Sequence, residues 1–247
     1  MKNLAVLASG RGSNFQAIID HIGLGVLQNV KLSMLIANDP TAAAVTIARQ
    51  NQIPFEILEG VHNKRFSNAQ DRELARRNFD ERVLAVLEGN RIDFVALAGF
   101  MQVLGKRVVS NYNFRIMNIH PSIDLVRFGG RGMFGDRVHA AVIQAGEKES
   151  GCTVHYVDES VDGGPIILQS RVQIKSGDDP QTLGHRVLVH EHRTYSKALQ
   201  LHADNRIRII NGNVTLDQSG EWEDQWNQRQ EIFTMTERPI KSTVYST

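Results

Sequence analysis

Asn118 and His120 stand two residues apart in the stretch Ile116 to Ser122, at the end of a short apolar run. Residues i and i+2 of a β-strand face the same side, so a strand ending here would point the amide and the imidazole into one space. Pro121 then ends the strand, because it has no N–H to donate. A donating amide beside an imidazole that shuttles a proton suits a carbonyl that acquires negative charge. A polar strand end that meets a turn explains this stretch equally well.

A second candidate segment follows the apolar run Leu4 to Ala8 and includes Gly12, Ser13 and Asn14. Apolar residues recur at helical spacing after it, which predicts a strand, a glycine turn and a helix. This arrangement aims free backbone N–H groups at an anion, and Ser13 and Asn14 can add side-chain donors. A dinucleotide fingerprint would have glycine at position 15, where this chain has Phe15. The loop therefore favours a monophosphate over a pyrophosphate, and a merely connecting turn remains the alternative.

A third segment completes the candidate rim, because Gly99 and Phe100 follow an expected strand from Ile92 to Ala98. Parallel sheets bind ligands beyond the carboxyl ends of their strands, so this segment, the glycine loop and the Asn118 to His120 stretch are expected at one edge. A tight, glycine-rich loop around Asp162 follows a later expected strand. In the long helix after Pro180, the sequence His190-Glu191-His192 suggests a metal site. We reject that interpretation because residues i and i+2 of a helix diverge, and we expect no metal.

Strands and helices alternate along the chain, which predicts an α/β fold. We expect a Rossmann-like, doubly wound, mostly parallel sheet with helices on both faces. Residues 59–70 and 123–136 are expected to be loops, and a helix is expected from Glu73 to Leu87. Asn211-Gly212 predicts a hairpin, and the residues after it lack helical or strand periodicity. The predicted organisation is a catalytic domain at 1–210 and a C-terminal extension at 211–247, made of the hairpin end and a polar tail.

Composition excludes several classes of protein. The 247 residues hold 28 Lys and Arg against 27 Asp and Glu, so no excess of positive charge indicates nucleic-acid binding. The single Cys152 excludes an intrachain disulfide and suits a reducing cytosol, so we expect a cytoplasmic protein. The longest apolar runs fall far short of the roughly 20 residues that span a bilayer. The N-terminal apolar run breaks at Gly10-Arg11, so we interpret it as a buried strand rather than a signal peptide. The sequence does not indicate an oligomeric state.

Five segments together make the chain resemble a phosphoribosylglycinamide formyltransferase. They are Ser-Gly-Arg-Gly-Ser-Asn (9–14), Leu-Ala-Gly-Phe-Met (97–101), Asn-Ile-His-Pro-Ser (118–122), Gly-Cys-Thr-Val-His (151–155) and Val-Asp-Gly-Gly-Pro-Ile (161–166). The resemblance covers roughly residues 1–210. It implies an enzyme of purine (IMP) biosynthesis that transfers the formyl group of the co-substrate 10-formyltetrahydrofolate to glycinamide ribonucleotide.

The resemblance also implies roles for residues of this chain. Asn118, His120 and Asp162 would be catalytic, with an oxyanionic tetrahedral intermediate stabilised by Asn118 and His120 and proton transfer assisted by Asp162. The implied binding residues are Gly12, Ser13, Asn14 and Arg76 for the substrate phosphate, Glu191 for the glycinamide end, and Met101, Gln102, Val103, Leu104, Asp158 and Ser160 for the folate.

The sequence departs from the family pattern after Ser122, where Ile123-Asp124-Leu125-Val126 replaces the usual Leu-Leu-Pro. Three other functions are alternatives. Hydrolysis of 10-formyltetrahydrofolate would use the same residues, but that enzyme type usually carries a regulatory domain before the catalytic one. Methionyl-tRNA formylation would need more chain after residue 210. A non-catalytic nucleotide-binding module would leave Asn118, His120 and Asp162 without a role.

Overall fold

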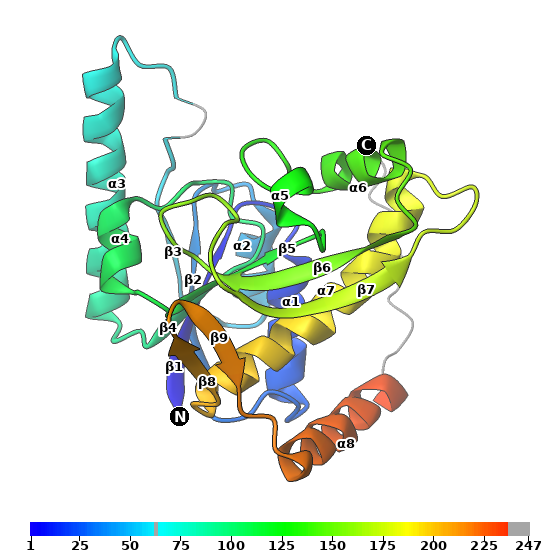
Figure 1. The fold of residues 1–247 in the computed structure, drawn as a ribbon. Helices are drawn as coiled ribbons and strands as arrows, with labels where there is room; N and C mark the ends of the chain where they lie inside the picture. Colours follow the sequence, from blue (N-terminus) through cyan, green and yellow to red (C-terminus); the bar gives the residue numbers. More distant parts are fainter. Residues whose placement is uncertain (62–63, 237–247) are drawn as a thin grey trace.

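The computed structural model describes residues 1–61 and 64–236, with side chains to residue 231. Within those residues the main sheet has seven strands in the order β3-β2-β1-β4-β5-β6-β7 (Figure 1). Its strands are β1 Lys2–Ala8, β2 Val30–Ala37, β3 Phe55–Ile57, β4 Phe94–Leu97, β5 Ile116–His120, β6 Glu149–Tyr156 and β7 Ile166–Gln173. The first five run parallel, and β6 and β7 are antiparallel to their neighbours. The predicted α/β, mostly parallel fold is confirmed.

Helices cover both faces of the sheet because the side chains of the central strands alternate between two cores. Leu4, Val6 and Ala8 of β1 enter one core, while Ala5 and Leu7 enter the other. The first core is covered by α1 Ser13–Gly23, α2 Ala43–Gln50 and α7 Pro180–Ala203. The second is covered by α3 Ala69–Gly89 and α4 Lys106–Asn111, seen at the left of Figure 1. This burial on both faces fixes the strand ends that carry the candidate site.

Two loop predictions need correction. The segment 59–70 was expected to be entirely loop, but α3 begins at Ala69, where the Asn68 side chain accepts a hydrogen bond from the Asp71 N–H at 2.8 Å. The glycine-rich segment 123–136 contains the short helix α5 Leu125–Phe128, capped by the Asp124 side chain, before α6 Asp136–Gln144. Both helix starts use an Asn or Asp side chain as the cap, and the prediction overlooked that signal.

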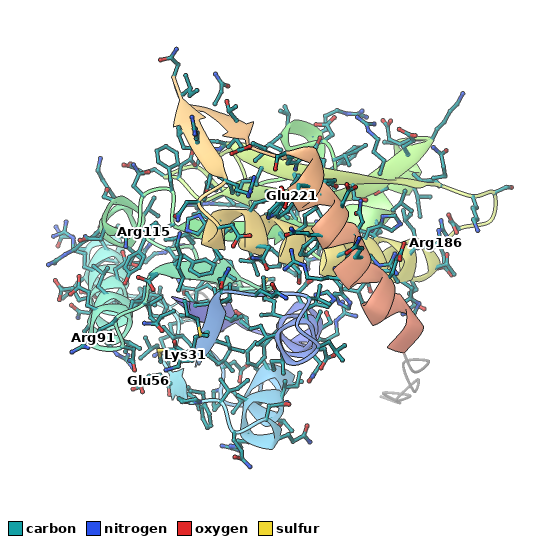
Figure 2. All side chains as sticks on the ribbon, turned by 90° about the horizontal axis from the view of Figure 1, so that it is seen from below. Lys31, Glu56, Arg91, Arg115, Arg186 and Glu221 are labelled. Carbon is teal, nitrogen blue, oxygen red and sulfur yellow. The ribbon has the colours of Figure 1, made fainter. Side chains whose placement is uncertain are left out.

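The chain after residue 210 completes the expected hairpin, with β8 Ile207–Ile210 and β9 Asn213–Leu216, and then forms a helix, α8 Gly220–Thr236. The lack of periodicity in this tail left the helix unpredicted. Trp222 and Trp226 are buried against Val26 and Leu201, and their rings stack with centroids 6.0 Å apart. Figure 2 shows α8 lying across the lower face of the molecule, with Glu221 labelled near its start. Residues 237–247 lie outside the described part.

Replacing Trp226 by alanine is expected to lower the free energy of unfolding by about 3 kcal/mol, because it removes a large buried ring from this small cluster. Chemical denaturation of Trp226→Ala beside the exposed-site variant Glu221→Gln would measure the difference. An unchanged denaturation midpoint for Trp226→Ala would mean that α8 contributes nothing to the stability of the fold.

No helix among the described residues is long and apolar enough to cross a membrane.

Candidate active site

The glycine loop between β1 and α1 lies at the carboxyl edge of the sheet, beside the loop that follows β4. The Ser9 N–H donates to the Gly99 carbonyl at 3.1 Å, and the Met101 N–H donates to Ser9 Oγ at 2.7 Å. Gly12 is the N-cap residue of α1 with φ 74°, in the left-handed region that favours glycine. The first N–H groups of α1 have no partner within the helix, so this loop can bind an anion.

Asn118, His120 and Asp162 meet in one place, although 44 residues separate the first from the last. The Asn118 amide donates from Nδ2 to Asp162 Oδ1 at 3.1 Å. His120 Nδ1 lies 3.5 Å from Asp162 Oδ2. Asp162 has φ 58°, an unusual backbone conformation that aspartate tolerates better than most residues. The structure therefore brings together all three residues expected to be catalytic.

His155 is a fourth member of this cluster, and sequence reasoning gave it no role. Its Nε2 lies 3.2 Å from Asn118 Nδ2 and 3.6 Å from Asp162 Oδ1, and its Nδ1 lies 2.9 Å from the Tyr156 carbonyl oxygen. Because a carbonyl only accepts, Nδ1 carries a hydrogen, and Nε2 faces both the Asn118 amide and the Asp162 carboxylate. The hydrogen bond from Asn118 Nδ2 to Asp162 fixes the orientation of that amide, since the reverse would place its oxygen against the carboxylate. The signal available in the sequence was His155 itself, at the end of the Gly-Cys-Thr-Val-His segment.

The loop from Asp124 to Gly132 closes over the cluster through its backbone. His120 Nε2 donates to the Phe128 carbonyl at 2.7 Å, and the Gly130 N–H donates to Asp162 Oδ2 at 2.9 Å. Figure 1 shows α5 above the end of β5. The loop that contains the departure from the family pattern thus forms backbone hydrogen bonds with both His120 and Asp162.

Burial and charge set the protonation of this cluster. Burial lowers the pKa of His120 below its usual value, although the Asp162 charge and the Phe128 carbonyl oppose the change. Burial raises the pKa of Asp162, but the nearby His155, His120 and Gly130 N–H outweigh it and the net pKa falls.

Glu191 reaches the site from α7, 177 residues beyond Asn14 in the sequence. Asn14 donates from Nδ2 to Glu191 Oε2 at 2.7 Å, and both side chains are buried. Burial raises the pKa of Glu191 to about 7, although the Asn14 hydrogen bond and the positive charge of Arg11 lower it. Its neighbour His190 pairs instead with Ser170 Oγ at 2.7 Å. The side chains of His190 and Glu191 thus diverge, and no group of three or more potential ligands that could hold a metal ion occurs in the described part of the chain.

The remaining predicted residues are divided between exposed and buried positions. Arg76 is half-buried in a basic hollow that Lys64, Arg72 and Arg131 also line, and among the described residues no hydrogen bond or ion pair joins it to the glycine loop. Of the predicted folate segment, Met101 and Val103 keep exposed surface.

Two other side chains of that segment are buried and already make contacts within the protein. Leu104 packs in the core, and buried Gln102 accepts from the Val61 N–H at 2.8 Å. Asp158 and Ser160 are exposed and hydrogen-bonded to each other. The proposed binding roles of all these residues stay predictions.

Comparison with known proteins identifies the family of this chain. The family model described as formyl transferase matches residues 2–199. The chain is 33% identical over 225 residues to the chloroplastic phosphoribosylglycinamide formyltransferase of Arabidopsis thaliana, covering 91% of this chain and 73% of that one. It is 32% identical over 217 residues to the phosphoribosylglycinamide formyltransferase of Haemophilus influenzae, covering 88% and 94%.

A solved structure of the phosphoribosylglycinamide formyltransferase of Coxiella burnetii has a TM-score of 0.75 at 35% identity, covering 87% of this chain and 93% of that one. The chain spans only 14% to 19% of the trifunctional purine biosynthetic proteins of Drosophila pseudoobscura pseudoobscura and human that it also matches. A candidate site at the carboxyl edge of the parallel strands, together with these matches, defines an enzyme of the formyl transferase family. Within that family the chain belongs to the phosphoribosylglycinamide formyltransferases, and the resemblance found in the sequence is confirmed.

Proposed function

We propose that this chain transfers the formyl group of 10-formyltetrahydrofolate to the amino group of glycinamide ribonucleotide. The observation that carries the proposal is the cluster of Asn118, His120 and Asp162 at the edge where the glycine loop also lies. Asp162 lies 3.1 Å from Asn118 Nδ2 and 3.5 Å from His120 Nδ1. A neutral amine attacks the formyl carbon, and the formyl oxygen gains negative charge in a tetrahedral intermediate. The bond from the formyl carbon to the folate nitrogen then breaks, the carbonyl re-forms on the new amide, and the folate nitrogen takes up the proton that the amine loses. The co-substrate supplies the one-carbon unit, and the protein supplies position and electrostatic stabilisation.

The two donors to that oxyanion are the Asn118 amide and the His120 imidazole. Each donor of this kind is worth about 10²–10³ in rate. Asp162 holds the Asn118 amide by a hydrogen bond and favours the protonated form of His120 through its charge. The carboxylate would also relay the proton of the attacking amine to the leaving folate nitrogen, directly or through water.

Productive binding requires the Phe128 carbonyl to release His120. His120 Nε2 donates to that carbonyl, and the two hydrogens of the Asn118 amide face His155 and Asp162. A formyl oxygen must therefore replace the existing acceptors of these two side chains. For His120 the acceptor lies in the Asp124–Gly132 loop, so an outward movement of that loop would free its Nε2–H. Protonation of His120 then becomes more favourable as negative charge develops beside it.

Glycinamide ribonucleotide would bind between the glycine loop and the catalytic cluster. Gly12, Ser13 and Asn14 would hold its phosphate, since the start of α1 presents N–H donors there. Glu191 would accept hydrogen bonds from the glycinamide end. Arg76 is retained as a further phosphate candidate that lines the basic hollow. The folate would lie against Met101–Leu104 and the loop that holds Asp158 and Ser160.

The decisive experiment is an assay of purified protein with 10-formyltetrahydrofolate and either glycinamide ribonucleotide or water as acceptor. Formyl transfer to the ribonucleotide at rates far above hydrolysis is expected. Rapid release of formate that is independent of the ribonucleotide would instead identify a hydrolase. Tight binding of NAD(P) without binding of a folate analogue would identify a nucleotide-binding module.

Glu191→Gln is expected to raise the KM for glycinamide ribonucleotide by an amount that depends on pH. The pKa of Glu191 is about 7, so the wild-type side chain is largely neutral at pH 6 and largely ionised at pH 8. Glutamine resembles the neutral acid, so the KM ratio of variant to wild type should be near twofold at pH 6 and about tenfold or more at pH 8, the value of a charge-assisted hydrogen bond. Steady-state kinetics at both pH values measures the ratio, and a constant ratio would contradict the role.

A further inference from the structure

Asp80 is a buried carboxylate on α3 for which the proposed mechanism has no use. The residue is 7% exposed, and its Oδ1 accepts a hydrogen bond from the Gly105 N–H at 3.0 Å. Burial raises the pKa of Asp80, although the Gly105 N–H and the charge of Arg76 lower it. Removing a carboxylate from water destabilises a fold unless its partners compensate, so packing in the core alone does not account for this residue.

Gly105, at the start of α4, is matched to this carboxylate. Its φ is −82°, which every residue type adopts easily, so the backbone conformation does not require glycine. A Cβ at position 105 would instead lie 2.9 Å from Asp80 Cγ and closer still to its Oδ2. The absence of a side chain at this position is therefore what allows the carboxylate to reach the backbone N–H.

The segment between Phe100 and Gly105, which contains the predicted folate residues 101–104, is held at both ends by α3. The Phe100 ring stacks on Phe79 with centroids 6.5 Å apart, and Gly105 is bound by Asp80, the next residue of the helix. Figure 1 shows α4, which continues from this segment, lying beside α3 at the left of the molecule. Two neighbouring residues of one helix thus fix where the segment begins and ends.

The start of α4 also reaches the second predicted folate flank. Lys106 Nζ lies 3.0 Å from Glu159 Oε1, in the loop of residues 158–162. Both side chains of this ion pair are exposed, so it stabilises the arrangement little by itself. The buried hydrogen bond between Asp80 and Gly105 is therefore the stronger of the two contacts that position the start of α4.

We propose that Asp80 is a positioning residue of the folate site, an inference that rests on the function proposed above. Its carboxylate fixes the Gly105 N–H, and with it the backbone of residues 101–104, in one conformation before the folate binds. A binding segment that is already ordered loses less conformational entropy on binding, which increases affinity. Asp80 acts only through this segment, so kcat and ribonucleotide binding should not depend on it.

The test measures the KM of both substrates in Asp80→Ala and Asp80→Asn. Asp80→Ala removes the acceptor and is expected to raise the KM for 10-formyltetrahydrofolate about tenfold, roughly the value of one hydrogen bond to a charged group. Its kcat and its KM for glycinamide ribonucleotide should stay within about twofold. Asp80→Asn keeps an acceptor oxygen and should recover most of the loss. Calorimetric titration with tetrahydrofolate, the product, should show the same ranking without any chemical step.

Two control substitutions on α3 separate positioning from stability. Glu81→Gln breaks the exposed ion pair between the neighbouring residue and Arg107 of α4, and it should change neither KM. Leu87→Ala removes buried atoms about two turns farther along the helix, so it should lower the melting temperature while both KM values stay near the wild type. A selective loss in Asp80→Ala is then not the consequence of a less stable α3.

Gly105→Ala tests the same contact from the other side. The new Cβ must displace the carboxylate, so the affinity for tetrahydrofolate should fall about tenfold. In Asp80→Ala the carboxylate is absent, so adding Gly105→Ala should cause no further loss. The effects of the two single substitutions should therefore not add, as expected for residues in direct contact.

Three results would overturn this inference alone. They are equal rises of both KM values in Asp80→Ala, an unchanged KM for 10-formyltetrahydrofolate in that variant, and an unchanged affinity for tetrahydrofolate in Gly105→Ala. If Asp80→Ala does not fold, the titration of Gly105→Ala decides. If the wild type binds no tetrahydrofolate, or transfers no formyl group to glycinamide ribonucleotide, the proposed function itself fails.

Discussion

Asp162→Asn is expected to lower kcat about 10³-fold while the protein remains folded. The carboxylate accepts hydrogen bonds from the Asn118 amide and the Gly130 N–H, and its charge favours protonation of His120. Asparagine keeps one acceptor oxygen and tolerates φ 58° well, so this variant removes the charge with little backbone strain. Alanine at this position would add strain to the loss of the carboxylate, so asparagine gives the clearer result.

The same substitution has a second effect, on the pKa of His120. The Asp162 charge raises that pKa, so its removal must lower the pKa further below the wild-type value. An NMR titration of the imidazole would measure this change. Asp217→Asn, an exposed carboxylate paired with Arg206 near the hairpin, is the matched control and should leave both kcat and this titration unchanged. Retention of more than about a tenth of wild-type kcat in Asp162→Asn would refute the proposed proton-transfer role.

Gly12→Ala is expected to disrupt the phosphate loop. The residue has φ 74°, where a side chain costs about 1–2 kcal/mol, and a Cβ would lie 2.9 Å from Ile47 Cδ1 and 3.0 Å from Ala44 Cα. The backbone must shift to relieve these contacts, which moves the N–H groups at the start of α1. We expect the KM for glycinamide ribonucleotide to rise more than about tenfold and the melting temperature to fall.

The same loop contains its own control. A Cβ at Gly10 would meet no heavy atom of the described residues within 4 Å, and Gly10 does not have positive φ, so Gly10→Ala should leave both measurements near the wild type. The KM for 10-formyltetrahydrofolate should be unchanged in both variants. Equal effects of the two substitutions on ribonucleotide binding would mean that the conformation of Gly12 does not determine the phosphate site.

The sequence alone determined the sheet and the edge at which the site lies. Alternating apolar strands and helices leave few topologies, and parallel strands place their carboxyl ends together. The glycine loop after β1, Gly99 after β4 and Asn118 with His120 in β5 were therefore predictable neighbours. The pairing of Asn118 and His120 followed from the two-residue repeat of a strand.

Tertiary structure alone decided the rest. The antiparallel register of β5 and β6 places His155 opposite Asn118, and a shift by one residue would turn His155 to the other face. The packing of α7 against α1 brings Glu191 to Asn14 and raises its pKa through burial. The hydrogen bond between the Asp124–Gly132 loop and His120 and the packing of His139 on α6 against Gly184 on α7 likewise depend on tertiary contacts. Burial and register arise from the packed chain as a whole, whereas local spacing determines only which residues share an element and a face.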